Sequence, residues 1–213
     1  MKLRTTALLA LTLLAGCRHA GDVTTEDGGG IYAVRSNCPI AGIPTGTGDI
    51  TLFSPEGSTD SAAVDVTAAI TQLRASCQED ANDVVSTVTF TVTGLRRDAG
   101  PARQVILQYF DVALRGGSTI SAKQLGAVAL NFPAGSVHAT GAARASVRVS
   151  RSAAYLPENV RQILTRPRKA GEAEAAVDPL AEPGVREAVA QATFEHLVGF
   201  QLTQDQLKYN VTR

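Results

Sequence analysis

The sequence contains few of the residues from which large hydrophobic cores and sugar-binding sites are usually built. Among its 213 residues there is no tryptophan and one methionine, with four tyrosines and six phenylalanines. A folded core must therefore come mainly from valine, isoleucine, leucine and alanine, which are often buried. Net charge is also missing, because 20 lysines and arginines balance 20 aspartates and glutamates. This balance gives no electrostatic basis for binding nucleic acid or an anionic membrane surface.

The familiar catalytic and metal-binding motifs are missing as well. The three histidines are His19, His138 and His196, and none belongs to an HExxH motif or a histidine–cysteine cluster. Ser136 and His138 would share one face of a strand, but no glycine-flanked nucleophile elbow surrounds Ser136. We therefore predict no catalytic residues, no metal site and no cofactor, and we expect that the protein is not an enzyme.

The N-terminus combines two cations with a short apolar run. Lys2 and Arg4 precede an almost wholly apolar stretch from residue 7 to residue 15. A helix needs about 20 apolar residues to cross a bilayer, so this stretch is too short to span one. It has the length of the apolar region of a signal peptide. A buried helix is an alternative that would not require the cationic start.

The apolar run ends in Leu14-Ala15-Gly16-Cys17, which resembles the lipobox of bacterial lipoprotein precursors. The resemblance covers about the first seventeen residues and does not extend further. It implies cleavage before Cys17, lipidation of the Cys17 thiol and lasting attachment through several acyl chains. An ordinary secretory signal, cut without lipidation, is the alternative. An aspartate after the cysteine retains enterobacterial lipoproteins at the inner membrane. Arg18 therefore favours an outer-membrane lipoprotein that faces the periplasm.

Lipidation of Cys17 would leave Cys38 and Cys77 as the remaining cysteines. An even pair in an oxidising compartment predicts a disulfide, with two buried free thiols as the alternative. Neither cysteine has a second ligand at the spacing of a zinc site. A bridge between them closes a loop of about 40 residues, which stabilises a fold by about 3–4 kcal/mol in the chain-entropy model.

The sequence divides into a leader, a tether, a β domain and a C-terminal region. Residues 1–16 are the predicted signal peptide, and residues 17–30 form a polar, glycine-rich tether. Residues 31–150 are predicted to form an antiparallel β domain, because apolar and polar residues alternate there with period two. The clearest alternation pairs inward-facing valines with outward-facing threonines between residues 84 and 93.

Turn-forming segments separate four consecutive strands between about residues 84 and 149, and shorter runs at 49–53 and 64–70 precede them. This pattern predicts a meander within a sandwich or a barrel. The run from residue 105 to residue 114 is apolar on both faces apart from a glutamine and an aspartate. We therefore expect it to be a central strand.

Residues 151–213 are predicted to pack on the β domain as a helix, a linker, a second helix and a hairpin. The first helix is expected near 157–165, and an exposed linker rich in alanine, glutamate and proline follows to about residue 184. The second helix, at about 184–197, would hold His196 near its end, where a cation favours the helix dipole. The alternating tail predicts a C-terminal hairpin, with a helical tail as the alternative. The predicted fold class is all-β, with one or two short helices in the C-terminal third.

One concentration of charge suggests a binding edge, formed by Arg96, Arg97, Arg103 and Arg115. We expect these side chains to gather at one end of the meander, where loops cluster. The sequence thus predicts a lipid-anchored cell-envelope protein with a non-catalytic binding or assembly role. Its partners would be the membrane, through the lipid, and another envelope protein or polymer. The alternatives are a small envelope hydrolase that uses carboxylates, and a barrel that carries a lipophilic ligand.

Overall fold

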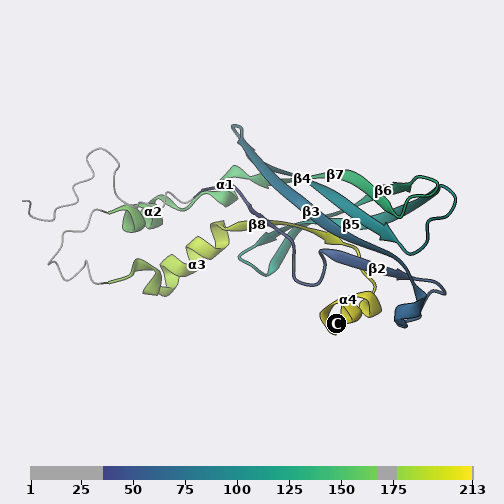
Figure 1. The fold of residues 1–213 in the computed structure, drawn as a ribbon. Helices are drawn as coiled ribbons and strands as arrows, with labels where there is room; N and C mark the ends of the chain where they lie inside the picture. Colours follow the sequence, from purple (N-terminus) through teal and green to yellow (C-terminus); the bar gives the residue numbers. More distant parts are fainter. Residues whose placement is uncertain (1–35, 167–176, 213) are drawn as a thin grey trace, which may run out of the picture. The chain divides into compact units, whose positions relative to one another are not determined.

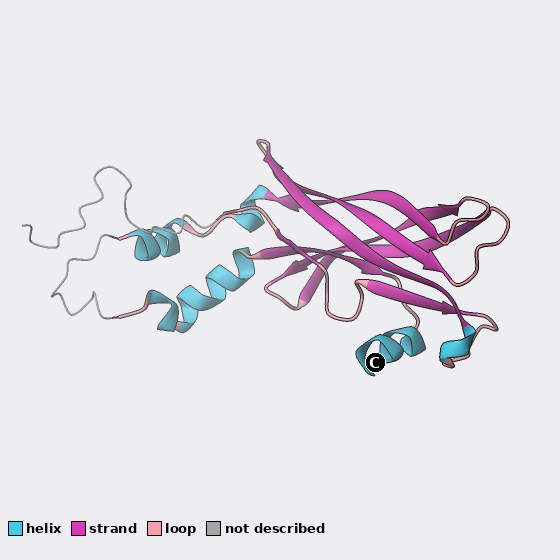
Figure 2. Cartoon of the chain, viewed as in Figure 1, coloured by secondary structure: helices cyan, strands magenta, loops and turns pink. Residues whose placement is uncertain are grey.

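The computed structural model describes residues 36–166 and 177–212. Cys17, the predicted signal peptide and the predicted tether lie outside the described residues, as does most of the predicted linker. The fold class is confirmed, because the described residues form two four-stranded sheets with short helices in the C-terminal third (Figures 1 and 2).

The two sheets are named here by their strands. Sheet A contains, in spatial order, β1 (Ile40–Gly42), β8 (Phe194–Phe200), β5 (Arg103–Arg115) and β6 (Thr119–Phe132). Sheet B contains β2 (Asp49–Phe53), β3 (Val64–Glu79), β4 (Asp83–Arg96) and β7 (His138–Ser150). Neighbouring strands are antiparallel, except that β1 and β8 run parallel.

The predicted alternation fixes which side chains enter the core. Along β4, Val88, Phe90 and Val92 point inward and are buried, whereas the threonines between them point outward. Side chains of sheet A, such as Leu130 and Phe200, fill the other side of the same hydrophobic cluster. β5 lies between β8 and β6, as predicted for a central strand, although the outward-facing Ile106 is exposed.

The predicted meander is wrong, because consecutive strands do not all pair with each other. β4 pairs with β3 and β7, and β5 pairs with β6 and β8. The chain changes sheets after β4, through residues 97–102, and returns after β6, through residues 133–137. A period of two shows which face of a strand is buried but not which strand lies beside it, so these two crossings could not be predicted.

A buried arginine connects the two crossing segments. Arg96 is 5% exposed, and its guanidinium donates hydrogen bonds to the carbonyls of Pro101, Gly100, Pro133 and Ser136, at 2.7–3.1 Å. The guanidinium also lies over the ring of a core residue, Phe132, 5.5 Å from the ring centroid. The cation is thus fully engaged with backbone oxygens, as a buried charge must be.

The described part of the C-terminal third contains four α-helices. They are α1 (Arg151–Ala154), α2 (Glu158–Thr165), α3 (Pro183–Ala192) and α4 (Gln204–Thr212). α2 lies where the first helix was predicted. α3 ends at Ala192, short of the prediction, and β8 begins two residues later. Within the described residues, no helix is long and apolar enough to span a bilayer.

The tail is helical where a hairpin strand was predicted. Thr203 and Gln206 form a reciprocal capping box: the Gln206 amide donates to the Thr203 hydroxyl, and the Thr203 amide donates to the Gln206 side chain. α4 then packs against β2, where the Tyr209 and Phe53 rings meet edge to face. The Asn210 side-chain amide donates to two backbone carbonyls there, those of Gly46 and Asp49.

The predicted disulfide between Cys38 and Cys77 is present. Cys38 lies just before β1 of sheet A, and Cys77 lies in β3 of sheet B. The covalent bond therefore joins the outer strand of one sheet to the other sheet, across a sequence separation of 39 residues.

We expect the double substitution of Cys38 and Cys77 by serine to lower the free energy of unfolding by about 3–4 kcal/mol, through loss of this loop constraint. Urea denaturation of the full chain measures the change. A reductant should destabilise the wild-type protein by a similar amount and leave the double variant unaffected. Equal sensitivity of both proteins to the reductant would contradict the prediction.

Candidate functional site

The outer face of sheet B carries a ladder of hydroxyl groups. Thr87, Thr89, Thr91 and Thr93 point outward from β4, and the strand register places β3 and β7 residues on either side of each. We call these threonines and their outward-facing neighbours on β3 and β7 the threonine face. Hydroxyl bonds cross the strands, since Thr87 Oγ1 lies 2.6 Å from Ser146 Oγ and the Thr71 hydroxyl donates to the Thr91 carbonyl. These bonds hold the face in a defined arrangement.

A β-bulge interrupts β3 in the middle of the threonine face. The register between β3 and β4 shifts between Thr71 and Arg74, so two β3 residues, Gln72 and Leu73, lie opposite the single β4 residue Phe90. One of them, Gln72, has a φ of 52°, the single positive φ outside glycine among the described residues. Its side chain accepts a hydrogen bond from the Thr91 hydroxyl. Bulges and such strained non-glycine residues are enriched near functional sites.

Two depressions hollow this face. The first has a volume of about 460 Å³ and is lined by Gln72, Arg74, Thr89, Phe90, Thr91, Ala142, Ala143 and Arg144. The second, about 470 Å³, continues over the other end of the strands, where its lining includes Thr71, Thr93 and His138. Both volumes fall in the range of small-molecule sites. Both depressions are open, and the small side chain of Ala142 beside Thr91 helps to hollow the first.

Two arginines flank the first depression at one level of the sheet. Arg74 on β3 and Arg144 on β7 both pair in register with Thr89 on β4. Within the described residues, neither guanidinium makes a hydrogen bond or an ion pair. The outward residues level with the four threonines include no acid. Two cations without counter-ions therefore face the same shallow space.

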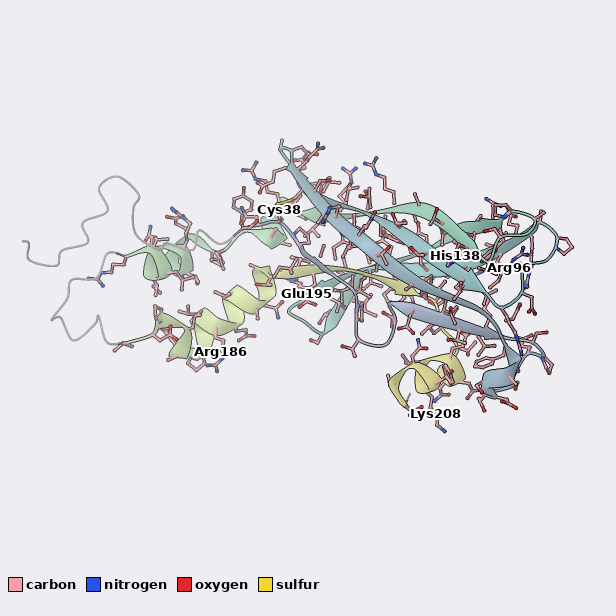
Figure 3. All side chains as sticks on the ribbon, viewed as in Figure 1. Cys38, Arg96, His138, Arg186, Glu195 and Lys208 are labelled. Carbon is pink, nitrogen blue, oxygen red and sulfur yellow. A yellow bond between two sulfur atoms is a disulfide. The ribbon has the colours of Figure 1, made fainter. Side chains whose placement is uncertain are left out.

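The arginines predicted as a binding edge do not form one. Arg103 pairs with Asp65 at 2.6 Å, and this hydrogen-bonded guanidinium holds the pKa of the Asp65 carboxyl below its usual value. Arg96 is buried as described, and Figure 3 shows it at the same end of the sandwich as His138, with Cys38 toward the other end. Arg115 lies at the opposite end of β5 from Arg103 and donates to the Gln191 carbonyl. Arg97 is exposed.

No protein-family model, curated protein or solved structure matches the chain.

A second group of polar side chains lies between the sheets. His196 Nδ1 is 2.9 Å from Ser86 Oγ, and His196 Nε2 is 2.8 Å from Asp111 Oδ1. All three residues are buried: Ser86 is 1% exposed, His196 0% and Asp111 4%. Because a carboxylate only accepts hydrogen bonds, Nε2–H donates to Asp111, and in a neutral imidazole Nδ1 then accepts a hydrogen bond from the Ser86 hydroxyl. We call this group the buried triad.

The buried triad has the residue types of a nucleophilic catalytic triad but not its access. A nucleophile must reach a substrate, and Ser86 is sealed inside the sandwich. The other Asp111 oxygen accepts a hydrogen bond from the Ser146 amide of β7, 3.1 Å away. The group therefore links three strands, β4, β8 and β5, to the edge of β7, which is a structural role.

Tyr109 makes a second hydrogen-bonded link to β7. Its hydroxyl donates to the Arg144 carbonyl at 3.0 Å, and its ring lies against Gly126 of β6, where any side chain would collide with it. Burial, together with the nearby Asp111 carboxylate, raises the pKa of the Tyr109 hydroxyl. The neutral, donating form of the phenol is therefore the form favoured here.

Sequence reasoning missed both groups. It placed His196 near a helix end, whereas the side chain lies inside the sandwich on β8. It paired Ser136 with His138, but the Ser136 hydroxyl bonds the backbone of His138. The arginines flanking Thr89 come from distant parts of the chain, so only the strand register brings them together. The alternation of threonines was the one available indication of this face.

We expect Asp111→Ala to lower the free energy of unfolding by about 3–5 kcal/mol, because buried donors on His196 and Ser146 lose their acceptor. Urea denaturation of the full chain measures the loss. Asp65→Ala, which removes an exposed ion pair, serves as the control and should cost about 1 kcal/mol or less. Equal losses in the two variants would show that the buried triad is not a sealed structural unit.

Proposed function

We propose that the protein is a lipid-anchored cell-envelope protein that binds an envelope glycopolymer through its threonine face, without catalysis. The observation that carries this proposal is the hollowed, uncovered face of sheet B, with its two arginines that lack counter-ions. Membrane attachment rests on the lipobox resemblance at Cys17, which also supports an outer-membrane location facing the periplasm.

An extended polymer suits the shape and chemistry of this face. The two depressions lie along the same strands, so together they offer a longer surface than one small molecule needs. Aromatic residues, which usually line sugar sites, are few in this chain, so a sugar would be held here by hydrogen bonds. Rows of hydroxyl groups can both donate to and accept from sugar hydroxyls. Arginine side chains supply charge, and their planar guanidinium groups can also stack.

Binding without turnover fits the placement of the candidate catalytic groups. The buried triad lies between the sheets, and the Ser136 hydroxyl is engaged by backbone atoms. The space between the sheets is filled by the side chains of one large hydrophobic cluster, which favours a binding surface over a carrier of a lipophilic ligand.

Ala142→Phe tests the binding face, because a phenyl group there would fill the first depression without removing a charge. We expect the full chain carrying it to bind purified envelope glycopolymer about tenfold more weakly in co-sedimentation, a loss of about 1.4 kcal/mol. Ala127→Phe is the matched control, since Ala127 is also an exposed alanine on an edge strand, on the outer face of sheet A. Equal effects of the two substitutions would contradict the proposal.

Cys17→Ala tests the anchor. Because the lipid would be attached to the Cys17 thiol, we expect the variant precursor to remain uncleaved and to take up no labelled fatty acid in a bacterial host. The wild-type chain should be labelled and should fractionate with membranes. Normal processing of the variant would show that the N-terminus is an ordinary secretory signal.

A further inference from the structure

Arg74, Thr89 and Arg144 form a line of outward side chains across three adjacent strands. Neighbouring strands lie about 4.8 Å apart, so the two arginines begin about 10 Å apart, on either side of the threonine. All three residues line the first depression. Two long side chains at this spacing can converge above the Thr89 hydroxyl.

The surroundings of this line leave the charges available. Two other exposed arginines of the sandwich are paired with acids, Arg148 with Asp83 and Arg103 with Asp65. No acid occupies the levels of the sheet around Thr89. Two like charges that share a space with no counter-ion repel each other, and an anion between them would remove that repulsion.

The backbone near this line is also unusual. The bulge that contains Gln72 immediately precedes Arg74 and sets its register with Thr89. On the other side, Tyr109 holds the carbonyl of Arg144, and Asp111 holds the amide of Ser146. The β7 segment that carries Arg144 is thus fixed by contacts that the surrounding sheet ladder does not provide.

We infer that Arg74, Thr89 and Arg144 form a phosphate-binding subsite, and that the glycopolymer bound by the threonine face is phosphorylated. Each guanidinium can bind two oxygens in a fork, and the threonine hydroxyl can donate to a third. A terminal phosphate group offers three oxygens to these donors, whereas a carboxylate offers two. The inference rests on the proposed function and names the chemistry of its ligand.

A phosphorylated polymer fits this face better than a lipid headgroup in a bilayer. The positions around the two arginines carry threonine, serine and alanine, with no large apolar side chain to enter the membrane interface. The second depression extends the site beyond the size of one headgroup.

Inorganic phosphate is the first probe. The full chain, held in a non-ionic detergent, is titrated with phosphate and with acetate while NMR follows the amides of residues 88–90. We expect phosphate to bind more tightly than acetate. Arg74→Gln and Arg144→Gln should each weaken phosphate binding about tenfold or more, and Thr89→Val should weaken it less. Arg97→Gln removes the same charge from an exposed site outside the face and should leave binding unchanged.

Equal losses in Arg97→Gln and Arg74→Gln, or equal affinities for phosphate and acetate, would overturn the subsite. A second arm compares the glycopolymer before and after treatment with a phosphatase. Dephosphorylation should weaken co-sedimentation of the wild-type chain about tenfold and have no effect on the Arg74→Gln, Arg144→Gln double variant. Unchanged wild-type binding would refute the phosphorylated ligand and leave the proposed function standing.

A third arm uses vesicles of phosphatidylglycerol, with phosphatidylcholine vesicles as the uncharged reference. The chain should bind the phosphorylated polymer in preference to either kind of vesicle. Tighter binding to phosphatidylglycerol that is lost in Arg74→Gln would assign the subsite to a lipid headgroup and overturn the polymer as its ligand.

Discussion

The guanidinium of Arg96 joins two of the segments in which the chain changes sheets, the one between β4 and β5 and the one between β6 and β7. Its donors bind carbonyls from residues 97–102 and from residues 133–137, so the exit of β5 and the return of β7 are held at one point. Because this return places β7 beside β4, the threonine face depends on it. A buried cation bound to four carbonyls tolerates little displacement, since every lost bond leaves a desolvated charge.

The inner and outer faces of sheet B are built from the same strands but have different roles. Inward-facing valines and aromatics of β4 make the core, while the threonines between them stay outside. The buried triad and Tyr109 add polar links from sheet A to β7, at Ser146 and Arg144. The outer face therefore rests on a rigid support, and it can be preorganised for a ligand.

The positions of the strands could be predicted because half-buried strands have a period of two, and β2 and β5 lie close to their predicted bounds. The pairing of the strands could not be predicted, because neither the burial of Arg96 nor the crossing segments produce a periodic pattern in the sequence. The helical tail could have been recognised from its capping box, Thr203 to Gln206. The disulfide could be predicted from the number of cysteines. The placement of Arg74 and Arg144 on either side of Thr89 depends on the strand register alone.

Strand β7 forms one edge of sheet B, and such edges can recruit further strands from neighbouring molecules. Here the Tyr109 hydroxyl donates a hydrogen bond to the carbonyl of Arg144, and the Asp111 carboxylate accepts one from the amide of Ser146. Side chains from the opposite sheet thus take the place of a fifth strand. These two backbone groups in the middle of β7 are therefore not available to pair with a strand from another molecule.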